Sequence, residues 1–137
     1  MDGTAGDTPG AAPAGTDGAL GPRGASDAAA AAGHTLVLIR TTVGTEQQAR
    51  EMAARLVGIH LAACVHFYPF ASVYRWKGAV QDDAEYAVEA RCIPEREGDV
   101  RQAMLEGHPY EEPLVEAWTV RGVPAGYFAW AQHGTGS

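Results

Sequence analysis

The sequence has few cysteines, little positive charge and no long apolar run, and each shortage excludes a class of protein. Only two cysteines occur, Cys64 and Cys92, and they form no CxxC pair, which predicts reduced thiols rather than a disulfide framework. No run of about 20 apolar residues exists, so no membrane-spanning helix is predicted. The formal net charge of −7 argues against a nucleic acid as partner.

The first 34 residues lack the side chains that build a hydrophobic core. Residues 1–34 are mostly glycine, alanine and proline, with no valine, isoleucine or aromatic residue. Such a segment buries too little apolar surface to offset the entropy lost on ordering, so we predict a disordered tail. The tail also lacks the basic start and the leucine-rich stretch of a secretory signal peptide, and we therefore expect a cytoplasmic protein.

Residues 35–137 hold nearly all the large apolar side chains, enough for one domain. Residues 35–41 form a branched apolar run typical of a buried strand. Thr45, followed three residues later by Gln48, is a capping box and predicts the start of a helix. The apolar positions of this helix form one stripe that we expect to pack on a sheet: Ala49, Met52, Ala53, Leu56 and Val57.

Residues 62–78 are the longest extended stretch. Period-two alternation places Val65 and Phe67 on one face and Cys64, His66 and Tyr68 on the other. The proline at position 69 cannot donate a ladder hydrogen bond, which predicts a bulge or a strand at the sheet edge. The following Lys-Gly pair, residues 77 and 78, is the expected hairpin turn.

The second half of the domain repeats a strand–helix–strand pattern. Residues 84–92 alternate cleanly and predict the strand that follows the hairpin turn. Pro94 suits the first turn of a second helix, whose inner stripe is Val100, Ala103 and Met104. Residues 114–120 read as a fourth strand, and Pro124 opens a short final helix.

The predicted order of elements is strand, helix, strand, strand, helix, strand. This order is typical of the α+β ferredoxin-like βαββαβ sandwich, here with a short extra C-terminal helix. Both long helices are expected on one face of the sheet. The other face would expose apolar side chains, and the long second strand would leave an open edge, which predicts self-association. The final helix could cover part of that face.

The segment HPYEEP, residues 108–113, is the first candidate site. His108 carries an imidazole suited to copper, zinc or nickel, and Glu111 and Glu112 could add oxygen ligands. Three candidates this close in sequence rarely close a coordination sphere alone, and the two flanking prolines restrict the backbone. Two interpretations stay open: a rigid helix-to-strand connector, or a ligand-facing segment in a cleft between subunits.

The two cysteines are the second candidate site. A tight turn at residues 77 and 78 pairs residues whose numbers sum to about 155 or 156, and Cys64 and Cys92 sum to 156. Two thiols opposite each other could share a soft ion such as Cu(I), or oxidise. A bulge at Pro69 would separate them, and a buried cysteine is also common as a small apolar residue.

Several motifs occur together in an order that resembles the CutA family of divalent-cation tolerance proteins: LAACVHFYP (61–69), SVYRWKG (72–78), EARC (89–92), HPYEEP (108–113) and YFAW (127–130). The resemblance covers Thr35 to about His133. It implies a homotrimer of ferredoxin-like subunits, a cytoplasmic location, a link to tolerance of copper and other divalent cations, and no catalytic activity. Some members carry a copper-associated Cys and His where this sequence has Thr41 and Gly107.

Two functional hypotheses follow. The first is a non-enzymatic trimer that requires no cofactor and binds copper or another divalent transition metal weakly through His108, with Glu111 or Glu112 across a subunit interface. The second is a trimeric sensor similar to nitrogen-regulatory PII proteins, which would bind a small anionic effector between subunits through Arg91 and Tyr110, beside Trp76. An enzyme is the third class, and the sequence offers no nucleophile with a base near it.

Overall fold

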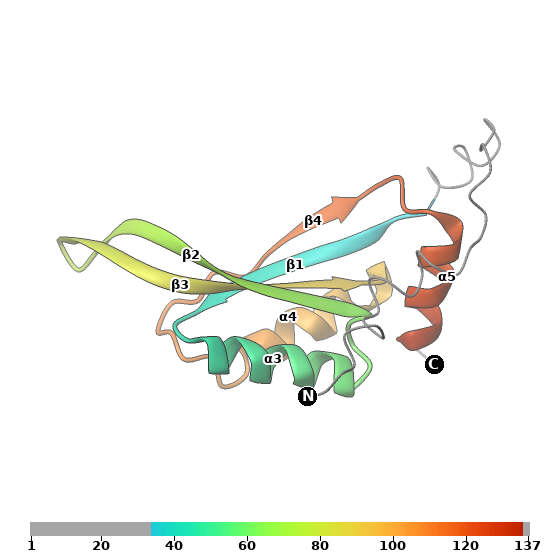
Figure 1. Cartoon of the computed structure of the whole chain (residues 1–137), viewed down its shortest axis with the longest axis horizontal. Coiled ribbons are helices and arrows are strands. Elements are labelled where there is room, and N and C mark those ends of the chain that lie inside the picture. Colours follow the sequence, from blue (N-terminus) through green and yellow to red (C-terminus); the bar gives the residue numbers. More distant parts are fainter. Residues whose placement is uncertain (1–33, 136–137) are drawn as a thin grey trace.

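Alternating apolar residues build four strands, and amphipathic stretches build the helices between them (Figure 1). The computed structural model describes residues 34–135, so the prediction of disorder for the tail concerns residues almost wholly outside it and stays a prediction. In chain order the elements are β1 (Leu36–Val43), α3 (Glu46–Gly58), β2 (Cys64–Trp76), β3 (Ala79–Cys92), the 3-10 turn η2 (Pro94–Arg96), α4 (Glu97–Leu105), β4 (Glu116–Val120) and α5 (Ala125–Gly134).

The four strands form one antiparallel sheet in the order β2-β3-β1-β4, which confirms the predicted ferredoxin-like arrangement. Helices α3 and α4 lie together on one face of this sheet (Figure 1). The main core lies between that face and the helices, and its largest fully buried members are Ile39, Val43, Leu56, Val88, Val100 and Met104. We call the opposite side of the sheet the open face.

Helix α3 begins where the sequence predicts. Thr45 is the N-cap, and its side chain and that of Gln48 complete the capping box. The buried positions of the helix are Ala49, Met52, Ala53 and Leu56. The prediction that Val57 belongs to the inner stripe is wrong, because Val57 is 43% exposed. Burial at positions 49, 52, 53 and 56 already fills the stripe, and the next residue turns about 100° away from it.

Strands β2 and β3 form a long hairpin that projects beyond the two helices (Figure 1). The register runs without interruption from Cys64–Arg91 to Trp76–Ala79. Pro69 therefore causes no bulge, and the alternative prediction of an edge strand is confirmed. Lys77 and Gly78 both have positive φ, as the tight hairpin turn between twisted strands requires.

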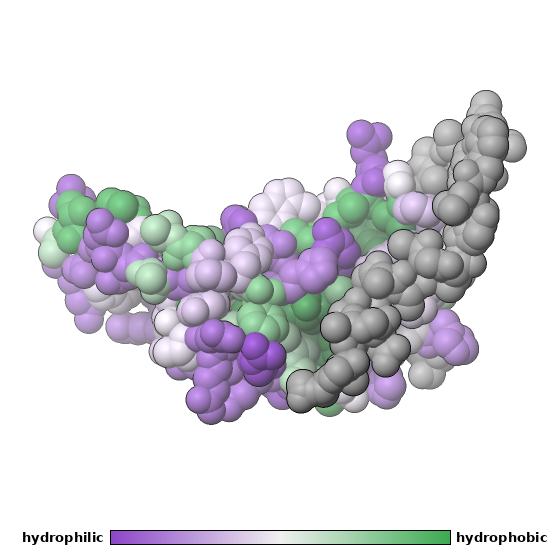
Figure 2. Space-filling view, in the orientation of Figure 1, coloured by the Kyte–Doolittle hydropathy of each residue, from purple (hydrophilic) through white to green (hydrophobic). Residues whose placement is uncertain are grey.

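The open face is covered at one end only. Helix α5 packs there over a second small core, formed by Leu36, Ile93, Val123 and Ala131. At the other end the projecting hairpin is bare, with Val73 70% and Val80 62% exposed. Figure 2 shows apolar surface at this end of the molecule. An unpartnered hairpin of this kind is typical of chains that associate with other copies.

Candidate ligand groove on the open face

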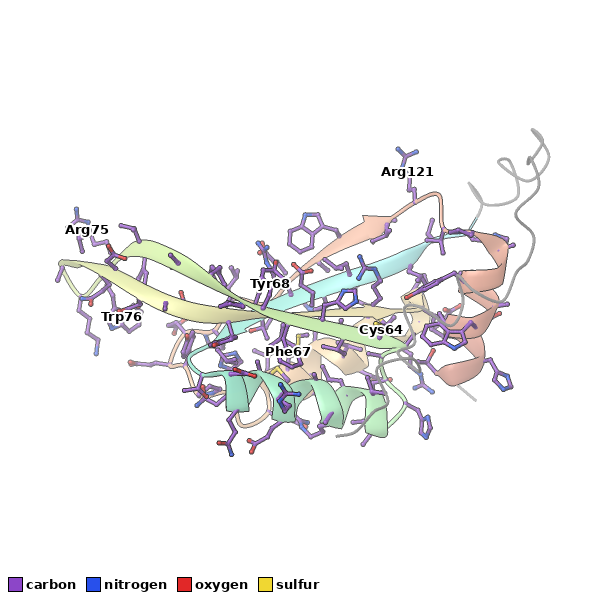
Figure 3. All side chains as sticks on the ribbon, viewed as in Figure 1. Cys64, Phe67, Tyr68, Arg75, Trp76 and Arg121 are labelled. Atoms are coloured by element: carbon purple, nitrogen blue, oxygen red, sulfur yellow. The ribbon has the colours of Figure 1, made fainter. Side chains whose placement is uncertain are left out.

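A groove of about 960 Å³ runs along the open face between the β2–β3 hairpin and the segment HPYEEP. Trp76 stands near the hairpin end, and Tyr68 near the middle of the sheet (Figure 3). The residues that line the groove are Arg40, Thr42, Tyr68, Phe70, Ser72, Val73, Tyr74, Trp76, Glu85, Ala87, Pro109, Tyr110, Glu111, Glu112 and Leu114. We call this the sheet groove. Cavities of this volume and mixed lining are typical of ligand sites.

His108 is not a lining residue of the sheet groove, although Pro109 and Tyr110 are, and both of its ring nitrogens are occupied. The backbone N–H of Tyr110 donates to Nδ1 at 3.0 Å. Because Nδ1 accepts, Nε2 carries the proton and donates to Oγ1 of Thr41, 2.9 Å away and fully buried. This geometry supports the connector interpretation, since His108 ties residues 108–110 to the central strand β1. A metal ion could reach Nε2 only after the contact with Thr41 opens.

Burial of the His108 imidazole lowers its pKa below the usual value. When the pKa of a base is lower in the folded protein than in the unfolded chain, the folded protein loses stability as pH falls below the unfolded pKa. Over this pH range mainly the unfolded chain binds the proton. We expect the free energy of unfolding to decline as pH falls through about 6.5. Urea unfolding at pH 7.5, 6.5 and 5.5 measures this decline.

The matched variant is His108→Gln, which can still bond Thr41 but does not titrate. Its stability should change less between pH 7.5 and 5.5 than that of the wild type. At pH 7.5 it should be less stable by about 1–2 kcal/mol, since one of two ring contacts is lost. Parallel pH profiles for the two proteins would remove His108 as the titrating group.

The two carboxylates of the connector face the sheet groove. Glu111 Oε1 lies 3.7 Å from Nζ of Lys77, and this ammonium group lies 5.5 Å from the centroid of the Trp76 ring. Glu112 is a further lining residue. Across residues 34–135, no three His, Cys, Asp or Glu side chains gather closely enough to hold a metal ion. A full coordination sphere for a metal at the connector would need ligands from a second copy.

Three tyrosine hydroxyls on the open face each donate to a carboxylate of β3 at 2.7 Å. The pairs are Tyr68 with Glu89, Tyr74 with Asp83, and Tyr110 with Glu85. Burial and the hydrogen bond to Glu85 raise the pKa of Tyr110 above its usual value. Sequence reasoning missed these pairs. The alternation of β3 puts its acidic residues on one face, but the tyrosine partners lie on other segments.

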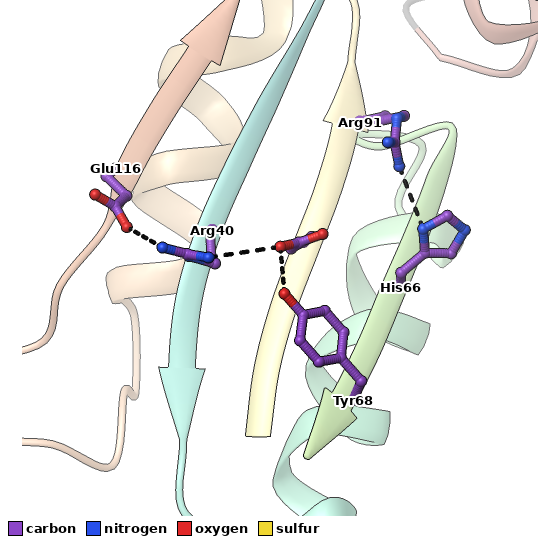
Figure 4. Close-up of polar contacts among 6 residues, drawn as sticks. Arg40, His66, Tyr68, Arg91 and Glu116 are labelled. Atoms are coloured by element: carbon purple, nitrogen blue, oxygen red, sulfur yellow. Dashed lines mark hydrogen bonds and ion pairs between the residues drawn. The ribbon is translucent and has the colours of Figure 1, made fainter. Parts of the chain in front are cut away.

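A row of polar contacts crosses all four strands next to the sheet groove (Figure 4). Arg40 on β1 donates to Glu116 on β4 at 2.8 Å and lies 3.8 Å from Glu89 on β3. Tyr68 on β2 completes the row through Glu89. The guanidinium of Arg40 also lies over the Trp118 ring, 4.9 Å from its centroid. These contacts fix the side chains that flank the groove.

Arg91 does not reach the sheet groove. It contacts His66 across the hairpin, with Nη1 3.2 Å from Nδ1 (Figure 4). Because a guanidinium only donates, Nδ1 accepts and Nε2 carries the proton. Tyr110 and Trp76 share the groove as the effector hypothesis requires, but Arg91 pairs with Cys64 at the other end of the hairpin. One copy therefore does not bring the predicted effector residues together.

The prediction that Cys64 and Cys92 lie opposite each other is wrong. The numbers of paired residues sum to 155 along the hairpin, so Cys64 pairs with Arg91. Cys92 pairs instead with Val37 on β1. Cys64 lies on the open face and Cys92 is buried in the core below the sheet. A difference of one residue in register moves a side chain to the other face, and the two thiols cannot share an ion or oxidise together within one copy.

The two thiols should differ strongly in reactivity. Burial raises the pKa of Cys92 to about 12, and the residue is fully buried. Cys64 is only partly buried; burial also raises the pKa of its thiol, but the positive charge of Arg91 opposes this shift. We expect iodoacetamide to label Cys64 in the folded protein at least about 100-fold faster than Cys92, as followed by mass spectrometry. Equal labelling rates before denaturation would contradict the placement of the two residues.

A comparison with protein families identifies the family of this chain. The model of the family described as CutA1 divalent ion tolerance protein matches residues 37–134. The chain belongs to the CutA1 family. The match spans every described strand except the first residue of β1, together with all of the described helices. The resemblance drawn from the sequence motifs is therefore confirmed.

Named CutA relatives cover the same part of the chain. The divalent-cation tolerance protein CutA of Thermus thermophilus is 31% identical over 100 residues, which are 72% of this chain and 97% of that protein. The protein of the same name from Thermotoga maritima is 30% identical over 95 residues, 69% of this chain and 94% of that protein. A rice relative named Protein CutA 1, chloroplastic, is 33% identical over 104 residues, 72% of this chain and 56% of that protein.

Solved CutA structures share the architecture. The structure of CutA from Synechococcus elongatus has a TM-score of 0.72 at 31% identity and covers 75% of this chain and 92% of that chain. That of CutA1 from Oryza sativa has a TM-score of 0.71 at 27% identity, covering 76% and 96%. Archaeoglobus fulgidus provides a structure titled as a periplasmic divalent cation tolerance protein, with a TM-score of 0.69 at 25% identity, covering 72% and 97%.

The printed names of these relatives include a chloroplastic and a periplasmic form, so the cytoplasmic location predicted for this chain stays a prediction. None of the helices between residues 34 and 135 has the length and apolar character needed to cross a membrane. The family is named for tolerance of divalent ions and not for a reaction.

Proposed function

We propose that this CutA1 family member acts in the divalent-cation response as a non-catalytic homotrimer that binds transition-metal ions weakly where two copies meet. The observation that carries the proposal is the position of the connector HPYEEP. It holds Glu111 and Glu112 on the wall of the sheet groove, on the side of the sheet opposite to helices α3 and α4. Copper or another divalent transition metal is the expected ion.

Self-association is supported by the bare open face. Trp118 is 42% and Leu114 is 54% exposed there. The β2–β3 hairpin also projects beyond helices α3 and α4. Monomers rarely leave such apolar surface in water. The number of three copies is what the resemblance to the CutA family implies. The second copy would supply the ligands that a single copy lacks.

The proposed ligands are Glu112, Glu111 and His108. Glu111 is held near Lys77 at 3.7 Å and would have to exchange this exposed ion pair for the metal. His108 would have to give up Thr41. Both exchanges oppose metal binding and account for the weak affinity that we propose. A net charge of −7 favours the approach of cations in general.

Calorimetric titration of Cu²⁺ and Zn²⁺ into the untagged full chain tests the proposal. We expect binding that weakens at least about tenfold in Glu112→Gln, since losing even an outer partner of a metal ligand typically costs about 10–100-fold in affinity. Glu95→Gln makes the same charge change at an exposed site away from the groove and should bind like the wild type. Equal affinity of all three proteins, or no heat of binding, would overturn the metal-binding role.

A further inference from the structure

A second groove, of about 350 Å³, lies on the helical side of the molecule. Positions 48, 51, 52 and 55 of α3 form one wall, because residues three, four and seven apart share one side of a helix. Glu106, Gly107 and Pro109, which follow α4, form the other wall. We call this the helix groove. Helices α3 and α4 lie on the face of the sheet opposite the open face (Figure 1), so association through the open face leaves the helix groove accessible.

The helix groove has an apolar base and a charged rim. Val43 is fully buried and Met52 is 7% exposed, and both belong to the main core. The charged lining residues Glu51, Arg55 and Glu106 are exposed at the rim. Because the base is part of a packed core, the groove is formed before any ligand arrives, as is usual for small-molecule sites.

A guanidinium is fixed at one wall of the helix groove. Nη2 of Arg55 donates to the backbone carbonyl oxygen of Ala103 on α4 at 2.8 Å. Glu51 precedes Arg55 by four residues, a spacing that commonly gives an ion pair, yet no carboxylate pairs with Arg55 within residues 34–135. The guanidinium is therefore held in place with N–H donors left over, and its planar fork suits a carboxylate.

Two carboxylates line the same groove, one from each wall. Oε2 of Glu51 accepts a hydrogen bond from Gln47 at 3.0 Å, which leaves Oε1 for another donor. Glu106 is the C-cap of α4, and its carboxylate has no ion-pair partner in the described part of the chain. The last turn of α4 also contains no basic residue. The negative end of the helix dipole is thus uncompensated, and this wall favours a cation such as an ammonium group.

We propose that the helix groove binds a free α-amino acid with an apolar side chain. Its carboxylate would lie at Arg55 and its ammonium group between Glu51 and Glu106. Its side chain would lie on the base formed by Val43 and Met52. A zwitterion suits the groove better than a metal ion, which the guanidinium repels, and better than a simple anion, which the two carboxylates repel. The inference goes beyond the proposed metal binding and does not depend on it.

Calorimetric titration of L-leucine into the untagged full chain at fixed ionic strength tests the inference. Leucinamide replaces the carboxylate by an amide, and isocaproate lacks the amino group, while both keep the branched apolar chain. We expect saturable binding of leucine and about fivefold weaker binding of each analogue, since each loses one exposed charged contact.

Two variants assign the charged ends of the ligand. Arg55→Gln should weaken leucine binding about fivefold and leave leucinamide binding unchanged, because only a carboxylate uses the guanidinium. Glu106→Gln should weaken leucine binding about threefold and should not weaken isocaproate binding, because only an ammonium group uses this carboxylate. The matched controls Arg50→Gln and Glu95→Gln make the same changes outside the groove and should bind like the wild type.

Circular dichroism first establishes that each variant is folded. The exposed Glu106 keeps the test decisive if Arg55→Gln, which also loses the contact with Ala103, fails to fold. Absence of leucine binding by the wild type would overturn the inference. Equal binding of the three ligands by every folded variant would also overturn it, because apolar contact alone would then explain the binding. Metal affinity is titrated separately, and its loss leaves this inference standing, since the helix groove contains none of the proposed metal ligands.

Discussion

Replacing Leu56 by alanine is expected to lower the free energy of unfolding by about 2–5 kcal/mol. Leu56 is fully buried at the end of α3, within the core that joins this helix to the sheet. Its backbone carbonyl also accepts hydrogen bonds from the N–H groups of Leu61 and Ala62, which hold the segment between α3 and β2 against the end of the helix. Truncation leaves a cavity that a closely packed interior cannot fill. Urea unfolding at a fixed protein concentration measures the loss.

The neighbouring residue provides the control. Val57 follows Leu56 directly on the same helix but is 43% exposed. Val57→Ala should change the free energy of unfolding by less than about 1 kcal/mol. Similar losses for both variants would mean that α3 is rotated relative to the sheet, and the description of the core would have to be revised.

Replacing Trp118 by aspartate is expected to dissociate the assembly while leaving each subunit folded. Trp118 lies on β4 and on the open face of the sheet, and the residue is 42% exposed in a single copy. Tryptophans that become buried between subunits often contribute 2 kcal/mol or more, so association should weaken at least about 30-fold. An aspartate at this position would lie beside Arg40 and would not strain the fold. Sedimentation velocity, with circular dichroism as the check on folding, gives the result.

Val57→Asp is the matched control for this experiment. It places the same charge at a residue of nearly equal exposure, 43%, but on the helical layer. The control should sediment like the wild type. If Val57→Asp dissociates the protein and Trp118→Asp does not, the copies meet through the helices and not through the open face.

The sequence predicts the fold well because its signals are local. The capping box at Thr45 and Gln48 begins α3 at its observed start. Period-two alternation puts Val65 and Phe67 together on one face of β2, and in the structure both pack against the buried core residues. The Lys77–Gly78 turn is predicted by residue type and confirmed by two positive φ angles. Each of these features depends on residues within a few positions of one another.

The register of the hairpin marks the first limit of this approach. A two-residue turn at 77 and 78 pairs Trp76 with Ala79 and gives a pair sum of 155, whereas a turn one residue longer would give 156 and place Cys92 opposite Cys64 on the same face. The sum of 155 places Arg91, and not Cys92, opposite Cys64. One residue of register thus separates a shared thiol site from two unrelated thiols.

The contacts of the candidate site mark the second limit. Thr41 and His108 lie 67 residues apart in sequence and 2.9 Å apart in space. Tyr110 and Glu85 come from a connector and a strand that only the tertiary fold brings together. Nothing local in the sequence encodes these pairs, because a hydrogen bond between distant segments depends on how the whole sheet and its connections are arranged. The sequence therefore predicts the residues of HPYEEP as candidates but not their partners.

The central claim is that the open face is an interface between copies of this chain. Metal binding between subunits depends on it. The most direct measurement is the mass of the untagged full chain in solution, by multi-angle light scattering at micromolar concentration. The account predicts a single species with about three times the 14.4 kDa mass of one chain. A well-folded species of 14.4 kDa under these conditions would contradict it.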